Sequence, residues 1–203
     1  GQLGLLGNKD YMDTPYSQTS YTEKTIRDQQ ATSVAEVLTN SDPSVRAAIG
    51  SSNRYDALTI RGFRIENSEI ALNGLYGLVP AYRVNPAPLE RIELLKGPAA
   101  FLNGMAPQGS IGGTVNVVTK RAAEDLTRLT AGYISDGRFG TELDLARRYG
   151  EQKEWGVRFN GGIDGGNTTI DRQSARNGFG SLGVDYHGER FRWSEIGRAS
   201  CRE

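Results

Sequence analysis

The sequence has very few of the residues from which most catalytic and metal centres are built. Its 203 residues include one cysteine, Cys201, and one histidine, His187. A hydrolase triad or a zinc centre needs more nucleophile, base or ligand groups than these two residues supply. A disulfide framework within the chain is excluded for the same reason. The composition therefore predicts a protein that is not an enzyme and holds no metal of its own.

Two glycine-rich segments also fail as nucleotide motifs. GPAAFLNG, residues 97–104, lacks the Gly-Lys-Ser/Thr ending of a phosphate-binding loop. GSIGGT, residues 109–114, does not stand between a strand and a helix as a dinucleotide fingerprint does. These glycines need another explanation.

An excess of charge and long apolar runs are missing as well. The 24 basic and 24 acidic residues cancel, which gives no support for nucleic-acid binding. No run approaches the roughly 20 apolar residues of a membrane-spanning helix, although a barrel strand needs only about 10 alternating residues. The chain begins with Gly1 and shows no signal segment, so we expect either that a signal was removed or that the N-terminus is truncated.

The last nine residues do not continue the pattern before them. Residues 195–203 read EIGRASCRE, which is what translation of the end of a common sequencing adapter gives. We interpret them as an artefact and exclude them from the fold prediction. The alternative is a natural basic tail.

Residues 12–121 mix short helices and short strands. The segments 22–30 and 32–40 predict helices, the second with Thr32 or Ser33 as N-cap and with its end before Pro43. Strands are predicted at 45–49, 57–60, 69–72 and 114–120, separated by connections that include RGFRIEN. This indicates an α+β domain with a small mixed sheet, which follows an extended N-terminal segment, residues 1–11.

The stretch 91–121, RIELLKGPAAFLNGMAPQGSIGGTVNVVTKR, organises this domain. Its glycines at 109, 112 and 113 suit close backbone approach, because strands flank them directly. The stretch closely resembles the end of the plug domain of TonB-dependent outer-membrane receptors. The segment from Tyr21 to Arg46 and the tetrapeptide IRGF, residues 60–63, resemble earlier parts of the same domain.

From Arg128 the chain alternates with period two. The clearest run places Trp155, Val157 and Phe159 on one face and Glu154, Arg158 and Asn160 on the other. Apolar and polar faces that alternate over such lengths are typical of a transmembrane barrel, and a short link at 149–153 contrasts with a long polar one at 165–177. Residues 122–194 are therefore predicted to be the first four or five antiparallel strands of an incomplete barrel. The family closes about 22 strands around its plug. His187 is predicted on the polar, lumen-facing side.

The resemblance implies uptake of a ferric siderophore in the bacterial outer membrane. Matching loops imply the ligand-binding candidates Arg54, Tyr55, Tyr76, Tyr82, Arg83, Phe101, Asn103 and Gln108. Aromatic rings can pack on a siderophore's organic shell, and arginine complements an anionic chelate. Packing of the loop tyrosines on their own loop is the alternative.

Three residues are candidates for contact between plug and barrel: Arg61, Arg91 and Glu93. The family makes Arg61 half of a charged lock, and the alternative is a surface arginine. For Arg91 and Glu93 an i,i+3 salt bridge or one at a strand edge is the commoner outcome.

The resemblance also implies partners. These are the siderophore, which carries the iron so that no protein cofactor is expected, then TonB of the inner membrane, and outer-membrane lipid around a monomer. No TonB box is recognisable in residues 1–13, and we expect it upstream. The opening GLLGNKDYMDTPY favours the siderophore branch. Cobalamin, haem, metal chelates or oligosaccharides are alternative ligands, and a soluble α+β binding domain with a β-sandwich tail is an alternative class.

Overall fold

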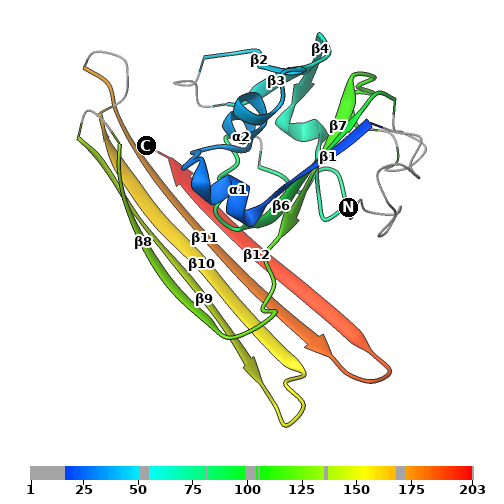
Figure 1. Cartoon of the computed structure of the whole chain (residues 1–203), viewed down its shortest axis with the longest axis vertical. Helices are drawn as coiled ribbons and strands as arrows, with labels where there is room; N and C mark the ends of the chain where they lie inside the picture. Colours follow the sequence, from blue (N-terminus) through cyan, green and yellow to red (C-terminus); the bar gives the residue numbers. More distant parts are fainter. Residues whose placement is uncertain are drawn as a thin grey trace. The chain divides into compact units, whose positions relative to one another are not determined.

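The computed structural model describes residues 17–50, 55–80, 82–98, 104, 106–134, 137–167 and 172–202. The chain divides into two compact units, Gly1–Thr119 and Lys120–Glu203. This division falls close to the predicted domain boundary after Arg121. Figure 1 shows the elements of both units.

The first unit contains a four-stranded mixed sheet in the order β1-β6-β7-β5. Its strands are β1 (Ser17–Thr22), β5 (Ile70–Leu72), β6 (Leu89–Lys96) and β7 (Gly113–Thr119). The strand β6 pairs antiparallel with both β1 and β7, whereas β5 pairs parallel with β7. The α+β prediction with a small mixed sheet is confirmed.

A second, three-stranded sheet consists of β2 (Val45–Ala47), β3 (Ala57–Ile60) and β4 (Phe63–Glu66). The strand β4 was missed, because the sequence RGFRIEN was predicted to be a connection. Arg61 and Gly62 both have positive φ, 52° and 89°, and form a tight turn that folds β4 back onto β3. A short 3₁₀ helix, η3 (Asn67–Glu69), leads from β4 into β5.

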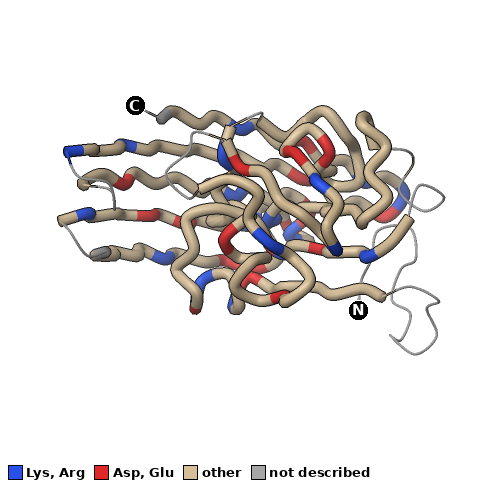
Figure 2. The backbone as a smooth tube through the Cα atoms, turned by 90° about the horizontal axis from the view of Figure 1, so that it is seen from above, with Lys and Arg blue, Asp and Glu red and all other residues tan. Residues whose placement is uncertain are grey.

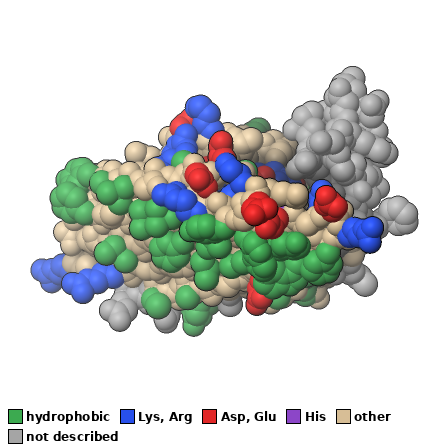
Figure 3. Space-filling view, turned by 90° about the horizontal axis from the view of Figure 1, so that it is seen from below, with side chains coloured by type: hydrophobic (Ala, Val, Ile, Leu, Met, Phe, Trp, Pro, Cys, Tyr) green, Lys and Arg blue, Asp and Glu red, His purple; other side chains and the backbone are tan. Residues whose placement is uncertain are grey.

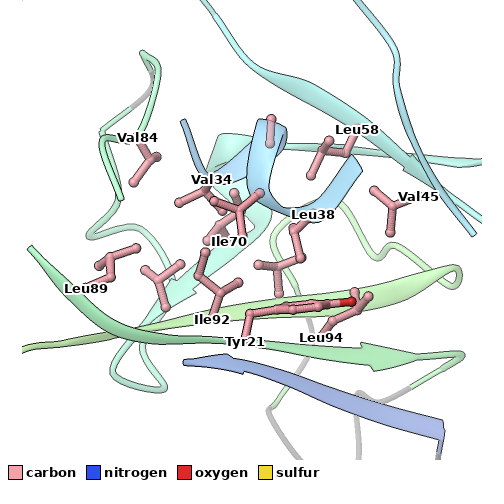
Figure 4. Packing of buried hydrophobic residues seen from close by; sticks show 14 of the residues in the cluster. Tyr21, Val34, Leu38, Val45, Leu58, Ile70, Val84, Leu89, Ile92 and Leu94 are labelled. Carbon is pink, nitrogen blue, oxygen red and sulfur yellow. The ribbon is translucent and has the colours of Figure 1, made fainter. Parts of the chain in front are cut away.

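Two short helices cover the mixed sheet, α1 (Glu23–Asp28) and α2 (Val34–Ser41). Ser33, one of the two predicted N-cap residues, caps α2: its hydroxyl accepts a hydrogen bond from the Glu36 amide at 3.2 Å. The core lies where α2 meets the strands, and Figure 4 shows Val34 and Leu38 of the helix facing Ile70, Ile92 and Leu94 of the sheet. This packing makes the unit a scaffold for its loops.

The second unit is one five-stranded antiparallel sheet whose strands follow sequence order (Figure 1). Its strands are β8 (Leu126–Ile134), β9 (Arg138–Tyr149), β10 (Trp155–Asn167), β11 (Ser174–His187) and β12 (Arg192–Arg202). The long link predicted at 165–177 is wrong, because Gly165–Asn167 pair with Ser174–Arg176 and belong to the strands. Backbone pairing outweighs the low strand propensity of Gly and Asn there. The structure continues β12 through residues 195–202, where we predicted an artefact.

The register divides this sheet into an apolar and a polar face. On the apolar face Leu129 pairs with Leu143, and Phe159 pairs with both Leu145 and Leu182. Figure 3 shows hydrophobic side chains gathered into a broad patch. On the polar face Asp144 pairs with Asn160. The predicted alternation is therefore present, with His187 on the polar side.

Charged residues of both signs are interspersed along the chain, as Figure 2 shows. This agrees with the balanced composition. Among the described residues, no helix is long and apolar enough to cross a membrane.

Candidate ligand-binding loops and the family of the chain

Two exposed tyrosines stack on each other in the first unit. The rings of Tyr55 and Tyr82 have centroids 5.4 Å apart and planes 27° apart, and the residues are 50% and 44% exposed. Tyr55 directly precedes Asp56 and β3, and Tyr82 lies in the segment between β5 and β6. The side-chain amide of Asn67 donates a hydrogen bond to the Tyr82 carbonyl oxygen. The sequence reasoning singled out both tyrosines but did not predict that they form one aromatic surface.

Arg83 lies beside this pair but faces inward. Its Nε donates to Asp56 Oδ1 at 3.1 Å, and both side chains are largely buried. Burial raises the pKa of Asp56, and the Arg83 charge and hydrogen bonds offset only part of that effect. The Arg83–Asp56 ion pair links the segment that carries Tyr82 to the residue that joins Tyr55 to β3.

Two further candidates lie on other loops. Tyr76 is half-buried, and burial together with the nearby Glu69 charge raises the pKa of its phenol. Its hydroxyl is buried and has no hydrogen-bond partner among the described residues. Gln108 is exposed, and its amide donates to the Ser68 hydroxyl at 3.3 Å. The candidates Arg54, Phe101 and Asn103 lie outside the described residues.

The three residues predicted to contact the barrel differ in their surroundings. Arg61 is exposed at its turn, and its backbone amide donates to the Ser44 carbonyl at 2.9 Å. Arg91 pairs with both Glu90 and Glu93 at 2.8 Å, so a salt bridge is present, as expected. It does not lie at a sheet edge, because β6 lies between β1 and β7. Glu93 is buried and also accepts from the Asn116 amide at 2.7 Å. The role of these residues in contact with the barrel stays a prediction.

Sequence reasoning missed the polar groups that organise the loops. Asp42 is buried and accepts hydrogen bonds from Tyr21, Ser44 and Lys96. Asp42 and Pro43 were recognised only as the end of a helix. The partners Tyr21 and Lys96 are brought to it by the pairing of β1 with β6, which no local pattern reveals. Among the described residues, no group of three or more His, Cys, Asp or Glu could hold a metal ion.

A small mixed sheet with short helices, followed by long strands that are apolar on one face, defines a plug domain joined to the start of a barrel wall. The family model of the TonB-dependent receptor plug domain matches residues 10–114. The chain therefore belongs to the TonB-dependent receptor plug family.

Three similar proteins illustrate the family. The ferrichrome receptor FcuA of Yersinia enterocolitica is 40% identical over 196 residues, which are 96% of this chain and 26% of that protein. The metal-pseudopaline receptor CntO of Pseudomonas aeruginosa is 44% identical over 75 residues, 36% of this chain and 10% of that protein. The crystal structure of BauA, the ferric preacinetobactin receptor of Acinetobacter baumannii, has 43% identity and a TM-score of 0.93, covering 98% of this chain and 30% of BauA. The chain thus spans less than a third of the relatives that it matches.

Proposed function

We propose that the chain is the plug domain and first barrel strands of an outer-membrane receptor that takes up a ferric siderophore. The observation that carries this proposal is the similarity of nearly the whole chain to two siderophore receptors, at 40% and 43% identity. The apolar face of β8–β11 would face outer-membrane lipid, and the polar face would face the lumen. TonB would be the energy-coupling partner of the monomeric receptor.

The ligand would contact the loops of the plug. The stacked Tyr55 and Tyr82 offer an exposed aromatic surface on a fixed base, which suits the organic shell of a chelate. Tyr76 and Gln108 would contribute a ring and an amide, together with Arg54, Phe101 and Asn103. The siderophore would hold the iron, so the plug needs no metal ligand. Because Arg83 is paired with Asp56, it would position Tyr82 and add little free charge to the site.

A receptor for another metal chelate is the second candidate. The 44% identity to the metal-pseudopaline receptor over 75 residues favours it. The two candidates differ in ligand and share the architecture, so one assay separates them.

The test is uptake by the complete receptor in a bacterial strain without receptors of its own. We expect growth under iron limitation on ferrichrome or on ferric preacinetobactin, the ligands named for the two relatives. Uptake of a chelate of another metal, with growth restored under limitation of that metal and not of iron, would favour the second candidate. Uptake of no metal chelate at all would contradict both.

Binding to the complete receptor tests the aromatic pair. Tyr82→Ala should weaken the affinity about 2- to 13-fold, because an aromatic contact contributes about 0.5–1.5 kcal/mol beyond its buried area. Lys24→Ala, on the exposed side of α1, is the control and should leave affinity unchanged. Equal affinities for the two variants would remove Tyr82 from the ligand site.

A further inference from the structure

The segment that follows β7, residues 120–125, is fastened to the polar face of the second unit. Asp144 of β9 lies at the centre of this attachment and is 7% exposed. Its carboxylate accepts hydrogen bonds from Arg158 Nε at 2.9 Å, from Arg158 Nη2 at 2.7 Å and from Lys120 Nζ at 3.3 Å. One buried carboxylate therefore holds a cation of the segment and a cation of β10 together.

Two arginines of the sheet also reach the backbone of the segment. Arg158 Nη1 donates to the Arg121 carbonyl at 2.9 Å, and Arg148 Nη1 donates to the Ala122 carbonyl. The amide of Arg148 donates to Asp125 Oδ1 at 2.8 Å. Hydrogen bonds with a charged partner are roughly twice as strong as neutral ones. The segment is thus held at both ends.

The strand pattern leaves room for these long side chains. In the register, Gly156 lies between Arg148 and Asp185, which form an ion pair at 3.1 Å. A Cβ at position 156 would lie 2.5 Å from Asp185 Oδ1 and 2.8 Å from Arg148 Nη1. A side chain at 156 would make the ends of both side chains shift, so the glycine leaves the pair room to form.

The residue before the segment is fixed separately, within the first unit. Asn73 Oδ1 accepts from the Thr119 amide at 3.1 Å, and Asn73 Nδ2 donates to the Thr119 hydroxyl at 3.0 Å. The chain is therefore clamped on both sides of the Thr119–Lys120 bond, by Asn73 before it and by Asp144 and Arg158 after it. Few backbone torsions remain between the two clamps.

We propose that residues 120–125 are an anchor that stays on the strands while the plug moves, so that plug displacement pivots at the Thr119–Lys120 junction. Asp144, Arg158 and Arg148 are positioning residues that act through the anchor. The pivot rests on the proposed transport function, whereas the anchor itself does not. Because the anchor stays on the strands, the plug would remain attached through it while it rearranges.

Trypsin cleaves after lysine and arginine, so Lys120 and Arg121 are both cleavage sites within the anchor. Limited proteolysis therefore tests the anchor, and it requires no ligand. In outer membranes that contain the complete receptor, cleavage at these residues should be slow. Asp144→Asn should accelerate it at least about tenfold, since it leaves two buried cations poorly paired and local opening exposes the segment. Asp164→Asn is the matched control, because Asp164 lies on the same face of β10, pairs with Arg138 and is away from the segment. Trypsin should cleave this variant at the rate of the unmodified receptor.

Retention of the heat-modifiable, folded barrel is required of each variant. If Asp144→Asn does not fold, Arg158→Lys serves instead, because it keeps the charge and loses the bidentate contact and the bond to Arg121. Cleavage of a folded variant at the unmodified rate would overturn the anchor. That result would not bear on the proposed uptake of a siderophore, which is tested separately.

A cysteine label tests the pivot in transporting cells. Ala122 is 2% exposed, so Ala122→Cys should react slowly with a maleimide small enough to enter the periplasm. We expect the rate to be the same at rest and during uptake, and at least about tenfold faster when Asp144→Asn is added. Faster labelling during uptake in the otherwise unmodified receptor would show that the segment leaves the strands and would overturn the pivot.

Discussion

Gly112 lies directly against Ile60. A Cβ at position 112 would lie 2.5 Å from the Ile60 carbonyl oxygen and 2.7 Å from the Cβ of Phe63. Ile60 and Phe63 flank the Arg61–Gly62 turn, and Gly112 immediately precedes β7. Two motifs that are far apart in the sequence, IRGF and IGGT, therefore meet through a contact that only glycine allows.

This contact predicts that Gly112→Ala loosens the hairpin of β3 and β4. The added methyl group would meet the Ile60 carbonyl on one side and the Phe63 side chain, next to its backbone, on the other. The plug should therefore lose about 1–3 kcal/mol of stability. Hydrogen exchange of residues 57–66 in the complete receptor measures the loss. Gly50→Ala is the control, because a Cβ there would meet nothing within 4 Å. Equal protection in the two variants would mean that the turn can move aside.

The elements with a strong local signal were predictable, and those that depend on distant partners were not. The N-cap of α2 could be narrowed to Thr32 or Ser33 from the residues that follow them, and Ser33 is the cap. The turn at Arg61 could not be predicted, because arginine rarely adopts positive φ, and β4 was missed with it. The parallel pairing of β5 with β7 joins segments that are separated by a whole antiparallel strand. Among the candidate site residues, the Tyr55–Tyr82 stack and the Arg83–Asp56 pair likewise arise only in the folded chain.

Asp42 makes the stability of the first unit depend on acid pH. Burial alone would raise the pKa of Asp42, but the hydrogen bonds from Lys96 and Ser44 outweigh burial and lower the pKa to about 2. A lowered pKa in the folded state stabilises the fold above the ordinary aspartate pKa near 4, and this stabilisation is lost as the pH falls toward 2. The contribution is of the order of 2 kcal/mol.

Hydrogen exchange of residues 17–50 and 89–96, corrected for its intrinsic pH dependence, should therefore rise between pH 4 and pH 2. Asp42→Asn should be less protected already at neutral pH, and its pH dependence in this window should be weaker. Asp28→Asn is the control, because Asp28 forms an exposed ion pair with Lys24 and should change little. An unaltered acid transition in Asp42→Asn would assign the transition to other carboxylates.

The alternation of β12 fails after Ser194. On the apolar face of the sheet, the charged Glu195 pairs with Val184. On the polar face, the apolar Ile196 pairs with Gly183. Arg198 Nη1 is buried and has no hydrogen-bond partner among the described residues. We therefore propose that residues 195–203 are not the natural continuation of the strand. Sequencing of the gene across codon 194 should replace them with residues that restore an apolar side chain at 195. Recovery of EIGRASCRE from genomic DNA would contradict this.

The aromatic residues of the strands predict how deep each position lies in the membrane. Tyr149, Trp155, Tyr186 and Trp193 form one row across four strands, and Tyr133 and Phe139 lie in contact near the other end. Trp155 and Gly165, which pairs with Phe139, are separated by ten residues. At about 3.3 Å per residue and a tilt of about 35–45°, the rows are about 23–27 Å apart, the height of an outer-membrane apolar band.

Leu143 lies midway between the rows, paired with Leu129 and Gly161. Leu143→Arg should therefore cost about 2–4 kcal/mol in the folding of the complete receptor into lipid vesicles, measured by urea titration. Tyr149→Arg, on the same strand and face but within the aromatic row, should cost only about 0–1 kcal/mol, because its charge can reach the interface. If both substitutions cost the same, the apolar face is not the surface that meets lipid, since only a lipid-facing surface makes the penalty depend on depth.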